Sequence, residues 1–157
     1  MSPNTGAVDE ALVRSVTETL ENMVFAEINP SEEKAWAASA DPALWASLPL
    51  LVPLYGNLWL GMPRSLLVRV VTMAYALPEE ELADRMLNDT LAEILNTLAG
   101  RLLNLLVPAH QTFRLGLPET GKAPGTSSEE TLRHWYFALE DDPFCVVGTG
   151  DFLDPTP

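Results

Sequence analysis

The longest uncharged stretch of the chain, residues 42–63, limits the folds that this sequence can adopt. Its 22 residues are long enough to cross a bilayer as a helix. Four prolines and the pair Gly56-Asn57 would interrupt such a helix, because each proline removes an amide donor that water cannot replace within lipid. Two apolar segments, 50–55 and 58–62, flank Gly56-Asn57 instead, and this pattern predicts a buried β-hairpin.

Length and charge narrow the class of protein further. The 157 residues suit one domain, residues 1–157, with the Gly- and Pro-containing segment 148–157 as a loose tail. The net charge of −13 disfavours binding to nucleic acid and to anionic membrane surfaces. A single cysteine cannot form an intramolecular disulfide, and the first residues show no basic segment followed by an apolar one. We therefore expect a cytoplasmic protein.

Apolar residues at helical spacing predict three main helices. The first covers residues 8–28 and ends at Asn29-Pro30, and residues 31–47 then form a loop with a short helix. The second covers residues 65–76, with Pro63 in its first turn. The third and longest begins at the three glutamates 79–81 and continues to Val107-Pro108.

The remaining segments predict strands. Aromatic and β-branched residues are enriched in residues 111–117, 132–139 and 144–147, separated by a loop at 121–128 and a turn at 141–143. The order of one helix, two strands, two helices and three strands predicts an α/β or α+β sandwich of a sheet against helices.

One side of the longest predicted helix carries an unusual set of residues. These residues follow one another at steps of four, three and four: Asp89, Glu93, Asn96 and Gly100. An exposed helix face usually mixes Lys with Glu, and a mid-helix glycine costs about 1 kcal/mol relative to alanine. Close approach of a binding partner would explain the glycine, and so would a tight contact with a neighbouring helix. A Glu and an Asn three residues apart also occur on ordinary surface helices.

This helix resembles the motif helix of the CheC/CheX/FliY phosphatases of bacterial chemotaxis. Their motif is Asp or Ser, three residues, Glu, two residues and Asn, and residues 89–96 match it. The following Gly100-Arg101 is similar too, and the 21 residues between Asn96 and Pro118 are close to the spacing at which that family has a proline. The order of elements and the segments 18–25 and 56–67 extend the similarity. A single complete motif looks most like CheX.

The resemblance implies a fold and an activity. The fold would be a CheC-like two-layer sandwich in which a mainly antiparallel sheet packs against long helices, and the protein would be a homodimer. The activity would be hydrolysis of the aspartyl phosphate on a CheY-like response-regulator receiver domain, in chemotaxis or two-component signalling. The protein would need no cofactor of its own, because the receiver supplies the Mg²⁺ that neutralises the phosphoryl oxygens.

The same resemblance assigns roles to the motif residues. Asn96 would orient the attacking water and Glu93 would bind a cation of the receiver, most simply its active-site lysine. Asp89 and Gly100, together with Glu93, would contact the partner. Two alternatives remain open: a non-catalytic adaptor that binds a receiver or a flagellar-switch component through this face, and a structural module without a receiver partner.

The first predicted helix contains a partial copy of the motif. A shift of 74 residues aligns Ser15, Thr19, Asn22 and Ala26 with the four residues of the longest helix. The copy has threonine where the motif has glutamate, so we expect a degenerate second site without activity. Two amphipathic helices of similar composition would also produce such an overlap by chance.

The other reactive side chains suggest no rival site. His110 and His134 lie 24 residues apart without a carboxylate at ligand spacing, so no metal site is expected. Cys145 lies in an apolar segment without a neighbouring cation, which indicates a buried and inert thiol. The four tryptophans are expected in the core or at an interface.

Overall fold

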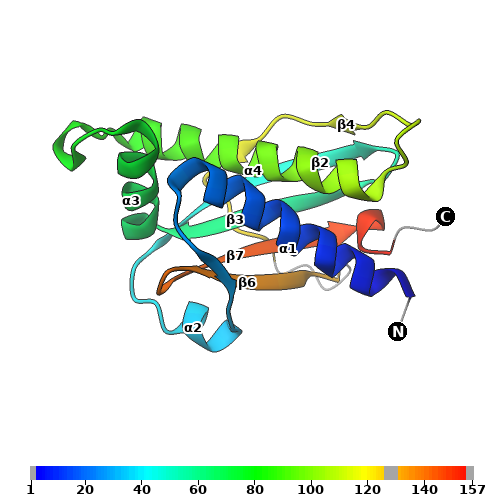
Figure 1. The fold of residues 1–157 in the computed structure, drawn as a ribbon, viewed down its shortest axis with the longest axis horizontal. Helices are drawn as coiled ribbons and strands as arrows, with labels where there is room; N and C mark the ends of the chain where they lie inside the picture. Colours follow the sequence, from blue (N-terminus) through cyan, green and yellow to red (C-terminus); the bar gives the residue numbers. More distant parts are fainter. Residues whose placement is uncertain (1–2, 126–130, 155–157) are drawn as a thin grey trace.

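The computed structural model describes residues 3–125 and 131–154. Within these residues, seven strands form one sheet, and two long helices lie side by side across one face of it and run in opposite directions (Figure 1). The elements in chain order are α1 (Pro3–Val24), β1 (Ile28–Pro30), α2 (Glu33–Ala37), β2 (Ala43–Val52), β3 (Gly56–Pro63), α3 (Arg64–Tyr75), the 3₁₀ helix η1 (Glu79–Glu81), α4 (Asp84–Leu106), β4 (Arg114–Leu115), β5 (Glu119–Thr120), β6 (Arg133–Leu139), β7 (Asp142–Gly150) and the 3₁₀ helix η2 (Asp151–Leu153).

The sheet has the order β1-β6-β7-β3-β2-β4, with β5 also paired to β2. Every pairing in this described sheet is antiparallel. The central strand β3 lies between β2, its hairpin partner, and β7 from the end of the chain. This arrangement confirms the predicted sandwich of a mainly antiparallel sheet against long helices.

The core lies between the sheet and the pair α1 and α4. Alternate residues of the central strands point into it, because side chains along a strand alternate between the two faces. Leu58 and Leu60 of β3 and Phe144 and Val146 of β7 are fully buried there. The apolar side of α4 is buried against these strands through Leu87, Leu91, Ile94, Leu98 and Leu102. No helix in the described ranges has the length and apolar character that a membrane span requires.

The predicted hairpin exists, but its turn lies elsewhere. The turn covers residues 53–55, whereas Gly56 and Asn57 belong to β3 and lie opposite Leu50 and Pro49. A Cβ on Gly56 would overlap the carbonyl oxygen of Thr149 in β7. The glycine at this position therefore permits close pairing of β3 with β7, which is not visible from the local sequence.

Several predicted helix ends are wrong. The first helix ends at Val24, because Phe25 has a left-handed backbone with φ of 55° and Ile28 starts β1 beside β6. The longest helix starts at Asp84, and the three glutamates before it form the separate helix η1. The second helix runs over Arg64–Tyr75, close to its prediction, and Pro63 precedes it.

The predicted loops and strands need similar corrections. Residues 31–47 contain the expected short helix, α2, but β2 already begins at Ala43. The strand predicted at 111–117 is reduced to the two residues of β4, and β5 follows as a second short strand. The turn before β7 consists of Glu140 and Asp141, so Asp142 and Pro143 are strand residues. The loop predicted at 121–128 is observed to residue 125, and its remainder lies outside the described residues.

The segment from residue 148 to 153 is not a loose tail. Gly148, Thr149 and Gly150 complete β7, and η2 follows directly. Phe152 and Leu153 are buried in the core, and the Phe152 ring lies so close to Gly148 that a Cβ there would overlap it. Composition alone predicted a loose tail, but the Phe152 side chain packs against apolar residues of the core. Residues 155–157 of the predicted tail lie outside the described residues.

Candidate functional site

Helix α4 presents three polar residues of the predicted motif on its solvent side. Asp89, Glu93 and Asn96 are exposed, and Gly100 is half-buried. They lie on this side because the leucine stripe of α4 is buried against the sheet and α1. Since side chains three and four positions apart are neighbours on a helix, the three side chains project in one direction.

Glu93 and Asp89 have partners at the protein surface. The Tyr75 hydroxyl, at the end of α3, donates a hydrogen bond to Oε2 of Glu93 at 3.3 Å. Nε of Arg85 lies 3.6 Å from Oδ2 of Asp89, one turn earlier on α4. Both side chains of this ion pair are largely exposed, so it adds little stability. Glu93 is therefore oriented by a residue from another helix, whereas Asp89 is only loosely held.

The Asn96 carboxamide has no hydrogen-bond partner within the described residues. Its side chain is exposed, and no hydrogen bond to it is formed within residues 3–125 and 131–154. A carboxamide offers one acceptor oxygen and two N–H donors, so this group can hold a water in a defined direction. The side chain is thus free to contact another molecule.

Gly100 borders open space. No described atom lies within 4 Å of the position that a Cβ would occupy at this residue. A tight contact with a neighbouring helix, one of the two explanations that the sequence left open, is therefore not observed. The glycine lowers the helical propensity of α4 without a packing reason inside the described chain.

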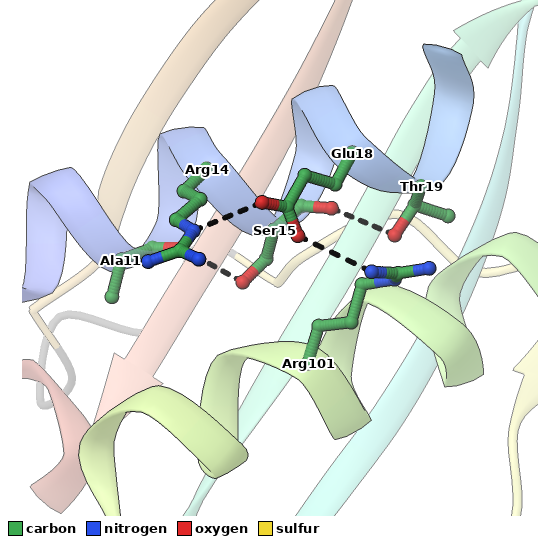
Figure 2. Close-up of polar contacts among 6 residues, drawn as sticks. All are labelled: Ala11, Arg14, Ser15, Glu18, Thr19 and Arg101. Atoms are coloured by element: carbon green, nitrogen blue, oxygen red, sulfur yellow. Dashed lines mark hydrogen bonds and ion pairs between the residues drawn. The ribbon is translucent and has the colours of Figure 1, made fainter. Parts of the chain in front are cut away.

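The partial copy of the motif on α1 has a different environment. Ser15 and Thr19 are buried, and each hydroxyl donates a hydrogen bond to the carbonyl oxygen one turn earlier, on Ala11 and Ser15, at 2.7 Å (Figure 2). Asn22 alone is exposed. The three residues therefore do not form an exposed polar face like that of α4.

A cluster of charges between α1 and α4 was not predicted from the sequence. Glu18 accepts a hydrogen bond from Nε of Arg14 at 2.9 Å and another from Nη1 of Arg101 at 3.2 Å (Figure 2). The hydrogen bond from Arg14 is the main cause that lowers the pKa of Glu18 below its usual value. Because Arg101 follows Gly100, this cluster links the motif helix to α1. The residues come from distant segments, so spacing gave no signal for it.

A shallow hollow of about 280 Å³ lies beside Glu93, between α4 and the end of α3. Its lining comes from two segments of the chain: Tyr75, Leu77, Met86, Asp89, Thr90 and Glu93. Sequence reasoning missed this feature, because Tyr75 and Leu77 lie outside the motif helix. The only available signal was the spacing of Met86, Asp89, Thr90 and Glu93 along one side of α4.

The other reactive residues lie away from this face. Cys145 is buried in β7, and burial raises the pKa of its thiol to about 12, which agrees with the expected inert thiol. His134 stacks on Tyr136 on the sheet, and His110 is exposed after α4. In the described parts of the chain, no group of three or more His, Cys, Asp or Glu side chains is arranged to hold a metal ion.

Solved structures share this fold over nearly the whole chain. Chemotaxis protein CheX from Vibrio vulnificus has a TM-score of 0.72 at 14% identity, covering 90% of this chain and 95% of the other. A chain of the CheX-CheY-BeF3-Mg²⁺ complex from Borrelia burgdorferi has a TM-score of 0.67 at 15% identity, covering 90% of this chain and 96% of the other. FliY from Thermotoga maritima has a TM-score of 0.66 at 14% identity, covering 98% of this chain and 93% of the other. No curated protein sequence matches the chain.

These structural similarities show that the protein has the CheC-like α/β fold. The family described as chemotaxis phosphatase CheX matches residues 52–139, more than half of the chain, including the whole of α4. The chain belongs to the CheX family, as the motif on α4 predicted.

Proposed function

We propose that this protein is a phosphatase that hydrolyses the aspartyl phosphate of a CheY-like receiver domain. The observation that carries the proposal is the free carboxamide of Asn96, exposed on α4 one turn from Glu93 in a member of the CheX family. The partner class is supported by the CheX-CheY complex from Borrelia burgdorferi, in which a chain with this fold is bound to CheY.

In this proposal Asn96 acts by orienting water. Its carbonyl oxygen accepts a hydrogen bond from the water, so that the lone pair of the water oxygen points at phosphorus. The new oxygen–phosphorus bond forms while the bond between phosphorus and the aspartyl oxygen breaks, which yields inorganic phosphate and a free aspartate. An acyl phosphate has a good leaving group, so positioning contributes more than acid or base strength.

Glu93 is proposed to fix the position of α4 on the receiver. Its carboxylate, oriented by Tyr75, would bind a cation of the receiver, most simply the active-site lysine. Asp89 and Gly100 would form the border of the contact. The Mg²⁺ that neutralises the phosphoryl oxygens is expected on the receiver, with no cofactor held by this chain.

The test is loss of phosphate from candidate receivers of the same genome, with wild-type protein and with Asn96→Ala. We expect the wild type to accelerate hydrolysis of one receiver, and Asn96→Ala to lower kcat by about 10²- to 10³-fold, as loss of one positioned polar group does. Thr97→Ala, at the next exposed position of α4, is the matched control and should retain the wild-type rate.

The alternative is a non-catalytic adaptor that uses the same face. If Asn96→Ala leaves phosphate loss unchanged while Glu93→Lys abolishes complex formation, the adaptor explanation is correct. If wild-type protein neither binds nor dephosphorylates any receiver, both explanations fail and a structural module remains.

We further propose that the protein is a homodimer located in the cytoplasm. The described sheet ends in β1 on one side and in β4 with β5 on the other, and an edge strand has backbone groups that a strand of a second copy can pair with. We expect sedimentation at micromolar concentration to give the mass of two chains. A mass of one chain would contradict the dimer and leave the phosphatase proposal unaffected.

A further inference from the structure

The hollow beside Glu93 is a second recognition feature on the proposed receiver-binding face. It is formed by the end of α3 and by two turns of α4, and it encloses about 280 Å³. Neither the proposed chemistry of Asn96 nor the docking role of Glu93 requires it. Its lining therefore carries separate information about the partner.

The lining combines apolar walls with an acidic border. Tyr75, Leu77 and Met86 supply an aromatic ring and two aliphatic side chains. The carboxylates of Asp89 and Glu93 stand one turn apart at the border, and the only ion pair at Asp89 in the described structure is the long contact with Arg85. Such a site suits a side chain with an aliphatic stem and a cationic end, because the stem packs on the walls and the cation meets the Asp89 carboxylate, which the proposed contact of Glu93 with the active-site lysine leaves free.

Thr90 supplies independent evidence that the hollow binds a polar group. Its side chain lines the hollow although the residue is only 3% exposed. The buried hydroxyls of Ser15 and Thr19 on α1 each bond to a carbonyl oxygen one turn earlier. Thr90 makes no such bond, and its hydroxyl has no hydrogen-bond partner within the described residues. In the described chain the enclosed side-chain atoms without a partner are on Arg101 and Arg133, so the Thr90 hydroxyl oxygen is reached from the hollow and can accept an N–H from a ligand.

We propose that this hollow is a socket for a lysine or arginine side chain on the receiver surface, distinct from the active-site lysine proposed to meet Glu93. The inference rests on the proposed function for the identity of the partner. The net charge of −13 favours a basic group over an acidic one in this position. The socket determines which receivers bind, and Asn96 determines how fast the phosphate is lost.

A first experiment tests the socket without any receiver. Methyl-labelled protein is titrated with the amides of acetyl-lysine and acetyl-arginine, and with acetyl-norleucine amide, which has a similar stem without the charge. We expect saturable NMR shifts at the methyl groups of Leu77, Met86 and Thr90 with the cationic amides, and smaller shifts with norleucine. Equal shifts for charged and uncharged amides, or shifts spread over other surfaces, would overturn the socket.

A second experiment separates binding from turnover with the receiver identified by phosphate loss. We expect Thr90→Val to raise KM about tenfold, the effect of one lost hydrogen bond to a charged group, with kcat unchanged. Thr19→Val removes the hydroxyl of another buried threonine, away from the hollow, and should leave KM at the wild-type value. The melting temperature of Thr90→Val should not fall, because the hydroxyl has no partner in the described chain. An unchanged KM for Thr90→Val would contradict the proposal.

The partner side chain is then located by charge reversal. Asp89→Lys should weaken binding of the receiver, and replacing one surface Lys or Arg of the receiver by Glu should restore it. Restoration by no such replacement would overturn the socket. If the protein acts on no receiver at all, the proposed function fails, but the amide titration still decides whether the hollow binds a cationic side chain.

Discussion

The exposed positions of Asn96 and Glu93 are set by their helix, and the Tyr75 hydroxyl additionally orients the Glu93 side chain. Both project from α4 into solvent, while the residues between them are buried against the sheet. Substitutions of exposed residues usually change stability by less than about 0.5 kcal/mol. Substitutions at these two positions should therefore change function without changing the free energy of unfolding, and measuring that free energy controls for misfolding.

Gly100 allows a prediction in which stability and function change in opposite directions. Gly100→Ala should raise the free energy of unfolding by up to about 1 kcal/mol, because alanine favours the helix and the added methyl group meets no described atom. The same methyl group should weaken binding of a receiver that approaches α4 closely. Urea unfolding and a binding titration with a beryllofluoride-loaded receiver measure the two effects.

Gly6→Ala is the matched control for this prediction. Gly6 also lies in a helix, α1, and a Cβ there also meets no described atom within 4 Å. This variant should keep wild-type affinity for the receiver. If Gly100→Ala binds as tightly as Gly6→Ala, Gly100 does not border the contact.

At the scale of elements, Glu18 links α1 to the motif helix. Arg14 and Arg101 both donate hydrogen bonds to it, and the bond from Arg14 is the largest cause of its lowered pKa. A carboxyl whose pKa is lowered in the folded state stabilises the fold above its unfolded pKa, about 4.5, and loses that contribution as the pH falls through the folded value.

The variant Glu18→Gln tests whether the charge of Glu18 stabilises the fold in this pH range. The variant should unfold at lower urea concentration than the wild type at pH 7, and the difference should shrink as the pH falls below about 4.5. Urea titrations from pH 7 to pH 3 measure it. Glu10→Gln, on α1 outside this charge cluster, is the control. A difference that stays constant with pH would show that the charge of Glu18 does not contribute.

The final 3₁₀ helix η2 is part of the core and gives a second prediction at this scale. Phe152 is 0% exposed, whereas Phe25 at the end of α1 is 92% exposed. Phe152→Ala should therefore lower the free energy of unfolding by about 3–5 kcal/mol, and Phe25→Ala should change it by less than about 0.5 kcal/mol. Thermal or urea unfolding measures both. Equal effects would mean that the end of the chain does not pack as the structure shows.

For the whole molecule, we expect the acidic charge to govern the encounter with the proposed receiver. The excess of 22 Asp and Glu over nine Lys and Arg produces a field that attracts basic surface on a receiver. We expect the association rate constant with the receiver to fall as salt is added, because screening shortens the range of this attraction. Stopped-flow mixing at several salt concentrations measures it. A rate constant that is independent of salt would contradict steering by charge.

The sequence predicted the fold class and the family because both depend on local patterns. The leucine stripe of α4 fixes which side of that helix is buried, and the positions of Asp89, Glu93 and Asn96 then follow from helical geometry. Helix ends and turns were predicted less well. The end of α1 at Val24 and the pairing of Gly56 with β7 depend on contacts with segments more than ninety residues away in the chain.

The periodicity of apolar residues thus predicted the helices and the motif face, because local spacing shows which side of a helix is buried. The order of elements predicted a sandwich of a sheet against helices, and the family resemblance added that the sheet is mainly antiparallel. Which polar groups have hydrogen-bond partners and which are free became visible in the three-dimensional structure alone. It buried Ser15 and Thr19, joined Glu18 to Arg101, packed Phe152 into the core, and placed Tyr75 and Leu77 beside Thr90. Those environments arise from packing between distant segments, and no spacing within a single segment encodes them.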